Sequence, residues 1–382
     1  MSRRPRLDRH DLVHGDGRRL FVYGVLRGHL DPAVVPSDLA GLHKRLDLLT
    51  GSWIAVSPSR NRRPNSSDAI DDGGDLETLC PLCPGGPEIP FGYDAVVFEN
   101  RFPSFVSDPP TVEGSLVGLS TGRCEVIVYT ERHQGSLASL TPDELARVIA
   151  MWRDRSSELW AVAEHRFVMV FENRGALVGA TISHPHGQIY AFDHLPPTTA
   201  LRDSTATRHR AETGRCLSCD LVAVDEASVD RRITQKEAFV VAVPFAARWP
   251  FEVHVRARRH GLRRLSDLEP AEQQALAGAL REVVTRYDGL FGFELPYMMV
   301  AQEAPEGQPD WHLSFEFLPP HRTAQLRKLP ASVETATGLF INDTLPEASA
   351  AALGRVRVGA ALQEAIPPEV TIRSRRSGTD EG

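Results

Sequence analysis

The chain repeats one pattern of residues at a spacing of about 128 positions, and this repeat limits the folds that it can adopt. Two histidines of the first half have counterparts 127 or 128 positions later, and a Cys-x-x-Cys pair precedes each copy. A fixed period of this kind indicates a duplicated structural unit whose copies share one fold. The matching residues are Cys80, Cys83, His133 and His184 in the first half and Cys216, Cys219, His260 and His312 in the second.

The residues around these histidines predict strands and helices in the same order in both halves. Glu125–His133 and Glu252–His260 are apolar, β-prone stretches that we expect to be strands ending in His. Each is followed by a helix start with Pro at the first helical position, after Thr141 in one half and after Glu269 in the other. The second helix is expected to run through Tyr287. The pattern predicts an α+β fold of two tandem units, with an antiparallel sheet flanked by helices.

This repeat divides the 382 residues into four predicted parts. Residues 1–44 carry no usable motif and are interpreted as an N-terminal extension. Residues 45–200 form the first half with the active site, residues 201–345 the second half, and residues 346–382 a C-terminal helix and tail.

Local composition predicts three smaller features. Trp53–Ser57 is expected to be a short strand, and the polar, Gly-rich stretch Arg63–Thr78 a flexible surface loop. Arg373–Gly382 is expected to be a disordered tail.

Charge and hydropathy exclude two classes of partner. The net charge of −7 argues against a general nucleic-acid binder, which would carry a basic excess. No run of about 18 apolar residues is long enough to span a membrane. The basic start, Met1–Arg6, is followed by polar residues rather than by the apolar stretch of a secretory signal. We therefore expect a cytoplasmic protein.

The two Cys-x-x-Cys pairs predict metal sites. Zinc prefers four thiolate or imidazole ligands, and each pair is followed by two histidines in the same order and at similar spacing. A redox pair is the alternative, although neither pair is expected to start a helix in a thioredoxin-like pattern. Exposed histidines at strand ends are a further alternative. The fifth cysteine, Cys124, lies in an apolar run and is expected to be a buried strand residue.

The segment between Gly179 and Tyr190 carries the strongest chemical signal. If it is extended, alternation places His184, His186 and Gln188 on one face. An imidazole can attack phosphorus when its attacking nitrogen is unprotonated, and a backbone carbonyl could hold the proton of the other nitrogen. A glutamine amide can donate to the phosphoryl oxygen. These histidines could instead serve only as zinc ligands or as a satisfied strand pair.

The sequence His184-Pro185-His186-Gly187-Gln188 in this segment resembles the active-site motif of the galactose-1-phosphate uridylyltransferases. This family is the transferase branch of the histidine-triad superfamily. The resemblance covers roughly residues 45–345. It includes the segments Leu49–Pro64, Val97–Pro103, Phe171–Gly175 and Val243–Glu252.

The resemblance implies roles for individual residues. His186 would be the nucleophile that becomes uridylylated, Gln188 would steady the phosphoryl group, and Glu334 would bind the hexose hydroxyls. The nucleotide and phosphate contacts would be Arg60, Arg63, Asn100, Asn173, Gly179 and Thr181. The first zinc would be held by Cys80, Cys83, His133 and His184, and a second by Cys216, Cys219, His260 and His312. Both halves would be histidine-triad-like units.

The resemblance also implies a reaction and an assembly. UMP would pass from UDP-glucose to His186, glucose 1-phosphate would leave, and galactose 1-phosphate would then take the UMP. The family is typically a homodimer, and Lys328 matches a residue lent by the partner subunit.

The second half departs from the first at the chemical positions. Ser314 stands at the repeat position of His186, so a second nucleophile is absent. An iron site of some relatives cannot be carried over, because its matching positions here include Gln302, Ser314 and Glu316. The segment after Lys328, which would contact the sugar, keeps Glu334 but lacks the family's usual aromatic, glycine and tyrosine pattern.

Other functions remain open at this point. An ADP-glucose phosphorylase or adenylyltransferase would use the same histidine, and labelling by ADP-glucose alone would identify it. A histidine-triad hydrolase is disfavoured because Gln188 stands where those enzymes have a third histidine. A non-catalytic, zinc-stabilised nucleotide-binding protein would take no label from any nucleotide.

Overall fold

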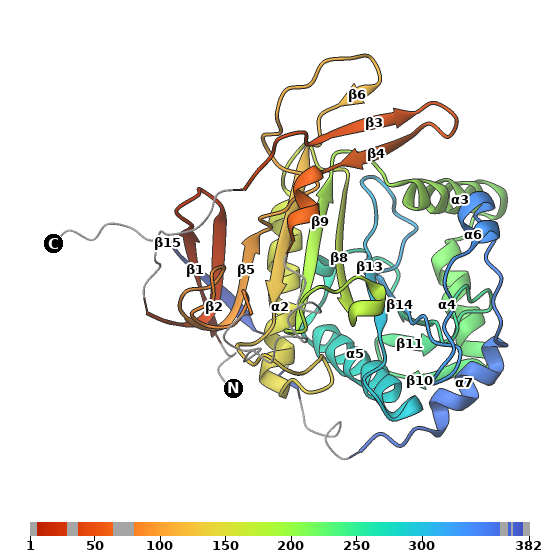
Figure 1. Ribbon diagram of the computed structural model, residues 1–382. Coiled ribbons are helices and arrows are strands. Elements are labelled where there is room, and N and C mark those ends of the chain that lie inside the picture. The colour runs from red at the N-terminus through yellow and green to blue at the C-terminus, as the bar shows by residue number, and fades with distance from the viewer. Residues whose placement is uncertain (1–5, 29–36, 64–79, 360–365, 368–369, 377–382) are drawn as a thin grey trace.

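The computed structural model describes residues 6–28, 37–63, 80–359, 366–367 and 370–376. These residues form a twelve-stranded sheet, a three-stranded sheet and helices packed around them (Figure 1). The strands are β1 (Arg6–Val13), β2 (Arg19–Arg27), β3 (His43–Asp47), β4 (Ser52–Val56), β5 (Gly92–Glu99), β6 (Val117–Gly118), β7 (Gly122–Val128), β8 (Phe167–Arg174), β9 (His186–Phe192), β10 (Arg232–Gln235), β11 (Phe239–Ala242), β12 (Val253–Ala257), β13 (Tyr297–Gln302), β14 (Ser314–Leu318) and β15 (Thr371–Arg376). The helices are α2 (Pro142–Trp160), α3 (Pro197–Thr213), α4 (Leu217–Ala227), α5 (Pro270–Phe291), α6 (Ser332–Thr337) and α7 (Pro346–Arg355), with short 3-10 turns η1 (Pro58–Arg62), η3 (Ala176–Val178) and η4 (Leu265–Asp267).

The large sheet has the order β10-β11-β12-β14-β13-β8-β9-β7-β5-β2-β1-β15. All its neighbouring strands pair antiparallel except β1 and β15. The order β13-β14-β12 in the second half corresponds to β8-β9-β7 in the first, and the halves meet where β8 pairs with β13. The predicted α+β class with an antiparallel sheet is confirmed.

Helices α2 and α5 cover one face of this sheet, where their apolar side chains join one core with alternate residues of the strands. Both helices begin where the sequence predicts. The Thr141 hydroxyl accepts from the Glu144 backbone N–H at 3.3 Å, and the Glu269 backbone N–H donates to the Glu272 carboxylate at 2.8 Å. Helix α5 continues to Phe291, four residues beyond the predicted end. None of the described helices has both the length and the apolar character needed to cross a membrane.

The opposite face carries both Cys-x-x-Cys segments. In the second half, Val222 of α4 packs on Val240 and Ala242 of β11. In the first half, the segment from Cys80 to Phe91 packs on β2 and β5 through a second apolar cluster. Both pairs are therefore held on the side of the sheet away from α2 and α5.

The predicted strands around the metal-site histidines end earlier than expected. Strand β7 ends at Val128 rather than His133, and β12 ends at Ala257 rather than His260. The carbonyls of Thr130 and Ala257 lie 2.7 and 2.8 Å from ring nitrogens of His184 and His312, so contacts to side chains from distant segments replace strand pairing there. The predicted strand Trp53–Ser57 is confirmed within one residue as β4. Cys124 is buried in β7, as predicted.

Both ends of the chain contribute to the large sheet. Residues 6–27 form β1 and β2, and β15 pairs in parallel with β1. The prediction of disorder is therefore wrong for Arg373–Arg376, while residues 377–382 lie outside the described residues. Apart from Arg63, the predicted loop Arg63–Thr78 also lies outside them. The division at residues 44, 200 and 345 stays a prediction. The sheet runs without a break through the β8–β13 pair.

Candidate active site and metal-binding clusters

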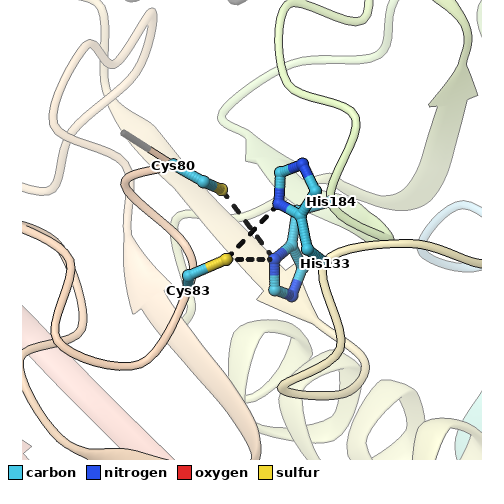
Figure 2. Close-up of side chains that lie close together, drawn as sticks. All are labelled: Cys80, Cys83, His133 and His184. Atoms are coloured by element: carbon cyan, nitrogen blue, oxygen red, sulfur yellow. Dashed lines mark hydrogen bonds between the residues drawn. The ribbon is translucent and has the colours of Figure 1, made fainter. Parts of the chain in front are cut away.

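Two cysteines and two histidines of the first half meet on the side of the sheet away from α2 and α5. Cys83 Sγ lies 3.3 Å from His133 Nδ1 and 3.5 Å from His184 Nδ1, and Cys80 Sγ lies 3.8 Å from His184 Nδ1 (Figure 2). All four ligand atoms lie within 4.8 Å of one another. The predicted first set of ligands is thus brought together in space.

The cysteine turn is held tightly by its own backbone. A Cβ at Gly86 would lie 2.7 Å from the carbonyl oxygen of Cys80, so only glycine fits where the turn closes on itself. The hydroxyl of Tyr93 donates to the carbonyl of Leu82 at 2.5 Å. Both contacts fix the direction of the two thiols.

His184 is oriented by its second ring nitrogen. Its Nε2 lies 2.7 Å from the carbonyl oxygen of Thr130, so Nε2 carries the proton and Nδ1 turns its lone pair to the thiols. Burial lowers the pKa of His184 to about 4, which keeps the ring neutral near pH 7. A neutral imidazole with a fixed tautomer is the form that binds metal.

The second set of predicted ligands forms a similar cluster. Cys219 Sγ lies 3.5 Å from His260 Nδ1 and 3.3 Å from His312 Nε2. His312 is held through Nδ1, which lies 2.8 Å from the carbonyl of Ala257, so the two clusters use opposite ring nitrogens at this position. The four ligand atoms, those of Cys216 included, again lie within 4.8 Å of one another.

One sequence argument against a redox pair is wrong. Cys216 is the N-cap residue of α4, and its Sγ accepts from the Cys219 backbone N–H at 3.4 Å. This pair does start a helix. The two imidazoles beside the thiols still favour a metal, because a redox pair needs no such ligands.

The nucleophile predicted from the sequence, His186, is the first residue of β9. Its Nδ1 lies 2.7 Å from the carbonyl oxygen of His184. This contact places the proton on Nδ1 and leaves the Nε2 lone pair available for attack. Burial lowers the pKa of His186, so the ring is neutral near pH 7.

Gln188 follows on the same side of β9, because Gly187 and Ile189 face the core beneath α2. The side-chain oxygen of Gln188 accepts from Asn100 Nδ2 at 3.3 Å, which turns its NH2 group outward. Asn100 is itself held, since its Oδ1 accepts from the Phe102 backbone N–H at 2.8 Å. His184 precedes the strand and turns to the cysteines. Of the three side chains expected on one face, only His186 and Gln188 therefore share it.

Two cavities flank His186. A cavity of about 80 Å³ is lined by Arg63, Asn100, Phe102, Thr181, His186 and Gln188, among others. A second cavity of about 190 Å³ is lined by Tyr129, Ser136, Glu172, Asn173, His184 and His186, among others. The imidazole of His186 can therefore be reached from both sides.

The predicted phosphate-binding arginines lie near the first cavity. Arg60, in η1, donates to the carbonyl of Phe102 at 3.3 Å and to the hydroxyl of Tyr190 at 3.2 Å. Burial, together with the neighbouring Arg60 guanidinium, lowers the pKa of Arg63. Arg63 lines this cavity beside Asn100, and Arg60 lies close to Arg63, so the two cations and the amide form a site that suits an anion.

Other predicted contacts lie apart from this group. Asn173 lines the second cavity, and Gly179 ends η3 in a left-handed conformation with φ of 83° that favours glycine. Lys328 is 1% exposed, and its Nζ donates to the Glu334 carboxylate at 2.8 Å. Within one chain, this pair is absent from the described linings of both His186 cavities.

The counterpart of His186 on the second half is built differently. Ser314 begins β14 as His186 begins β9, and Gln302 is its partner across the β13–β14 pair. Glu316, at the position of Gln188, accepts two hydrogen bonds from Arg202, at 2.7 and 3.0 Å. Nearby His254, Arg202 and Arg248 hold the pKa of Glu316 at about 2, against the effect of burial.

Two residues at the second cavity were missed from the sequence. Tyr129 and Glu172 line this cavity next to His186. Tyr129 lies in the predicted strand Glu125–His133, and Glu172 lies in the segment Phe171–Gly175 of the family resemblance. A buried acid within an apolar strand was the available signal for Glu172.

Models of a known family match both halves of the chain. The description "Galactose-1-phosphate uridyl transferase, N-terminal domain" fits residues 34–196, and the corresponding C-terminal domain fits residues 202–362. A galactose-1-phosphate uridylyltransferase of Thermotoga maritima is 37% identical over 323 residues, which cover 82% of this chain and 98% of the relative. One from Streptomyces lividans is 35% identical over 263 residues, covering 65% of this chain and 71% of the relative.

Solved structures share the same fold. A structure described as that of uridylyltransferase superposes with a TM-score of 0.73 at 30% identity, covering 84% of this chain and 99% of that one. An ADP-glucose phosphorylase of Arabidopsis thaliana superposes with a TM-score of 0.63 at 24% identity, covering 83% and 99%. At that identity the second likeness shows a common fold alone.

Proposed function

Because the chain belongs to the galactose-1-phosphate uridylyltransferase family and is a UMP-transferring enzyme, we propose that His186 carries the UMP in a covalent intermediate. The observation that supports this most is the contact between His186 Nδ1 and the carbonyl of His184, at 2.7 Å. It fixes the tautomer whose Nε2 is a nucleophile.

The proposed reaction has two steps that share one phosphorus atom. In the first, the Nε2 lone pair of His186 attacks the α-phosphorus of UDP-glucose, and an N–P bond forms while the P–O bond to the β-phosphate breaks. Glucose 1-phosphate leaves with the bonding electrons. Its phosphate is already a weak base, so no strong general acid is needed.

In the second step, a phosphate oxygen of galactose 1-phosphate attacks the same phosphorus. An O–P bond forms, the N–P bond breaks, and its electrons return to Nε2. The Nδ1 proton stays on the ring throughout, and the carbonyl of His184 stabilises the positive charge that the ring carries while it is uridylylated.

The neighbouring polar groups would hold the transferring phosphoryl group. The Gln188 amide, turned outward by Asn100, would donate to a non-bridging oxygen. Arg63 and Arg60 would neutralise phosphate charge from the first cavity, with Thr181 beside it. On the other side of His186, Asn173 would contact the nucleotide, and Gly179 would let the backbone approach it.

We propose zinc for both metal-binding clusters. Two thiolates and two imidazoles are the donor set of structural zinc sites. In the first cluster, Cys80, Cys83, His133 and His184 would hold the ion. Zinc would supply rigidity rather than chemistry there, because it would fix the residue whose carbonyl orients His186. The enzyme is further proposed to act as a cytoplasmic homodimer, with Lys328 and Glu334 reaching the hexose of a partner's site.

The test is a covalent label. Purified enzyme incubated with UDP-glucose should gain the mass of one UMP in intact-protein mass spectrometry, and His186→Ala should abolish this adduct completely. His10→Ala, on distant β1, is the matched control and should be labelled normally. Galactose 1-phosphate should remove the label.

Other outcomes separate the competing functions. Labelling by ADP-glucose but not by UDP-glucose would identify an adenylyltransferase or phosphorylase. No label from either nucleotide sugar would favour a non-catalytic, zinc-stabilised nucleotide-binding protein and would end the proposal.

A further inference from the structure

A buried carboxylate beside His186 is bound by two tyrosines that come from opposite sides. Glu172 of β8 accepts from the hydroxyl of Tyr129 at 2.9 Å and from the hydroxyl of Tyr297 at 2.6 Å. The three side chains are 5%, 1% and 0% exposed. Tyr129, Glu172 and Tyr297 are called the Glu172 cluster below.

Tyr129 reaches Glu172 by crossing over strand β9. In the sheet, β9 lies between β7, which Tyr129 directly follows, and β8, which carries Glu172. The crossing point is Gly187, where a Cβ would lie 2.3 Å from the Tyr129 hydroxyl oxygen and 3.0 Å from the carbonyl oxygen of Phe171. The glycine between His186 and Gln188 is therefore required for this contact.

The second half fills the same place with apolar groups. Gly187 is paired with Ile127, as Phe315 is paired with Val255, so Phe315 is the counterpart of Gly187. By the same register Ala257 is the counterpart of Tyr129. Ala301, which pairs with Phe315, is the counterpart of Glu172. One half has a glycine between two large polar residues, and the other has a phenylalanine between two alanines.

Both arrangements pack against the same side chain of α2. Trp152 lies edge-on to Tyr129, with ring centroids 6.1 Å apart, and is stacked on Phe315 at 5.9 Å. The apolar arrangement also fills the core, since Ala257, Ala301 and Phe315 are each 0% exposed. Burying a carboxylate costs free energy, whereas burying an apolar residue does not. Burial raises the pKa of Glu172, while the two tyrosine hydroxyls lower it. Packing alone does not explain why the polar cluster stands only beneath the half with the nucleophile.

We propose that the Glu172 cluster positions His186 and Gln188 for uridylyl transfer by holding the backbone of Gly187 from beneath. Fixed by Glu172, the Tyr129 hydroxyl sets the height of Gly187 in the sheet. It thereby sets the spacing between the attacking Nε2 and the Gln188 amide. This inference rests on the proposed function of His186. The three members of the Glu172 cluster are positioning residues rather than catalytic ones.

The first test removes one hydroxyl. In Tyr129→Phe we expect single-turnover uridylylation by UDP-glucose to slow about tenfold, since a small misplacement of reacting groups has a large effect on rate. The affinity for UDP-glucose and the zinc content should stay unchanged. Tyr287→Phe is the matched control: Tyr287 is fully buried and donates to the carbonyl of Phe251 at 2.8 Å, away from His186. It should lower Tm similarly and leave the rate unchanged.

The second test adds Tyr129→Phe to a variant of Gly187, in which Tyr129→Phe should speed labelling instead of slowing it. Gly187→Ala should slow labelling strongly, because the new methyl group meets the Tyr129 hydroxyl. Adding Tyr129→Phe to Gly187→Ala removes that oxygen and should restore part of the rate, although the same change slows the wild-type enzyme. Neighbouring residues couple in stability as well. A role in overall stability alone therefore predicts recovery of Tm in the double variant, with the same labelling rate for folded enzyme in all three variants.

The outcomes keep the two proposals apart. If wild-type enzyme is labelled and Tyr129→Phe is labelled as fast as Tyr287→Phe, the positioning role is wrong and the proposed function stands. If wild-type enzyme takes no label, the proposed function fails and this inference fails with it. Should Tyr129→Phe not fold, Tyr297→Phe removes the other donor to Glu172 and carries the same expectation.

Discussion

His184 contacts both the first metal-binding cluster and the nucleophile of the proposed reaction. Its ring faces Cys80 and Cys83, while its carbonyl accepts from His186 Nδ1. Any force that holds the ring also holds the carbonyl, because both belong to one residue. The sequence predicted that some backbone carbonyl would orient His186. It could not identify which one, since that depends on how the chain bends before β9.

Gln188 gives a prediction at this scale. In Gln188→Ala, uridylylation from UDP-glucose should slow about 100-fold, the usual effect of removing one hydrogen-bond donor to a phosphoryl or acyl oxygen. Stopped-flow or quenched-flow labelling measures this rate. Metal content should stay at the wild-type level, because Gln188 lies outside the two clusters of candidate ligands.

The matched control is Gln235→Ala, at the exposed end of β10, which should keep the wild-type rate. Loss of metal from Gln188→Ala would show that its role has been misassigned. A wild-type rate in Gln188→Ala would remove it from the proposed mechanism.

His14 gives a prediction about pH. It is 2% exposed, and burial, with the Arg18 charge as the next cause, lowers its pKa to about 4. In the unfolded chain the pKa returns to about 6.5, so the unfolded state binds a proton more readily below that pH. The neutral buried ring therefore contributes stability above pH 6.5 that is lost as the pH falls toward 4. At pH 4.5 the loss should be roughly 2–3 kcal/mol.

Urea unfolding at pH 7 and pH 4.5 measures this effect. His14→Leu should lose roughly 2–3 kcal/mol less than wild type between the two values. His10→Leu, in strand β1 just before His14 and less buried, is the control and should follow the wild-type curve. Equal losses in His14→Leu and wild type would contradict the prediction.

At the scale of elements, the sequence predicted which segments are strands and helices better than where the strands end. The Pro and acid signals placed the starts of α2 and α5 correctly. The strands before them were extended too far, to His133 and His260, because their residues remain β-prone after the backbone has turned. At or just past these strand ends, the carbonyls of Thr130 and Ala257 bond histidines from distant segments. Local sequence carries no signal for such a contact.

The two clusters should differ in what they do for activity. Cys83→Ser should lower Tm and also slow labelling of His186 at least about tenfold, because the first cluster holds His184. Cys219→Ser should lower Tm similarly and leave the labelling rate unchanged, because the second cluster holds His312, next to Ser314 rather than a nucleophile. Metal analysis, calorimetry and single-turnover labelling of both variants test this pair.

Two results would contradict the expected difference between Cys83→Ser and Cys219→Ser. Equal slowing in both variants would mean that either metal acts only through general stability. A wild-type labelling rate in Cys83→Ser, with its metal lost, would disconnect the first cluster from the nucleophile.

At the scale of the molecule, the repeat predicted the two halves but not the way the ends of the chain join the sheet. Strand β15 pairs in parallel with β1, although the two strands lie near opposite ends of the chain. The residues of β15 include three arginines and a serine, which resemble a solvated tail when read alone. Pairing with an existing edge strand, rather than its own composition, makes this segment a strand.

The proposed homodimer gives the last prediction. Several large apolar side chains on the segment from Leu326 to Leu345 are more than half exposed, together with Phe245. Exposed apolar groups clustered in this way mark interaction sites. The salt bridge between Lys328 and Glu334 is internal to the same segment, so the segment can meet a partner with its charges already paired. Leu329, which is 66% exposed and adjoins Lys328, is the side chain to change.

In Leu329→Glu, a carboxylate would be buried at the proposed interface without a partner, and dimerisation should weaken by about 100-fold or more. Sedimentation velocity at micromolar concentration should then show a monomer. Exchange with galactose 1-phosphate should fall in parallel, because a monomer lacks the partner's Lys328 segment. Val229→Glu, at a 76% exposed position outside this segment, should stay dimeric and active. If Leu329→Glu remained a fully active dimer, the segment would lie outside the dimer interface, and the sugar contacts proposed for Lys328 and Glu334 would be wrong.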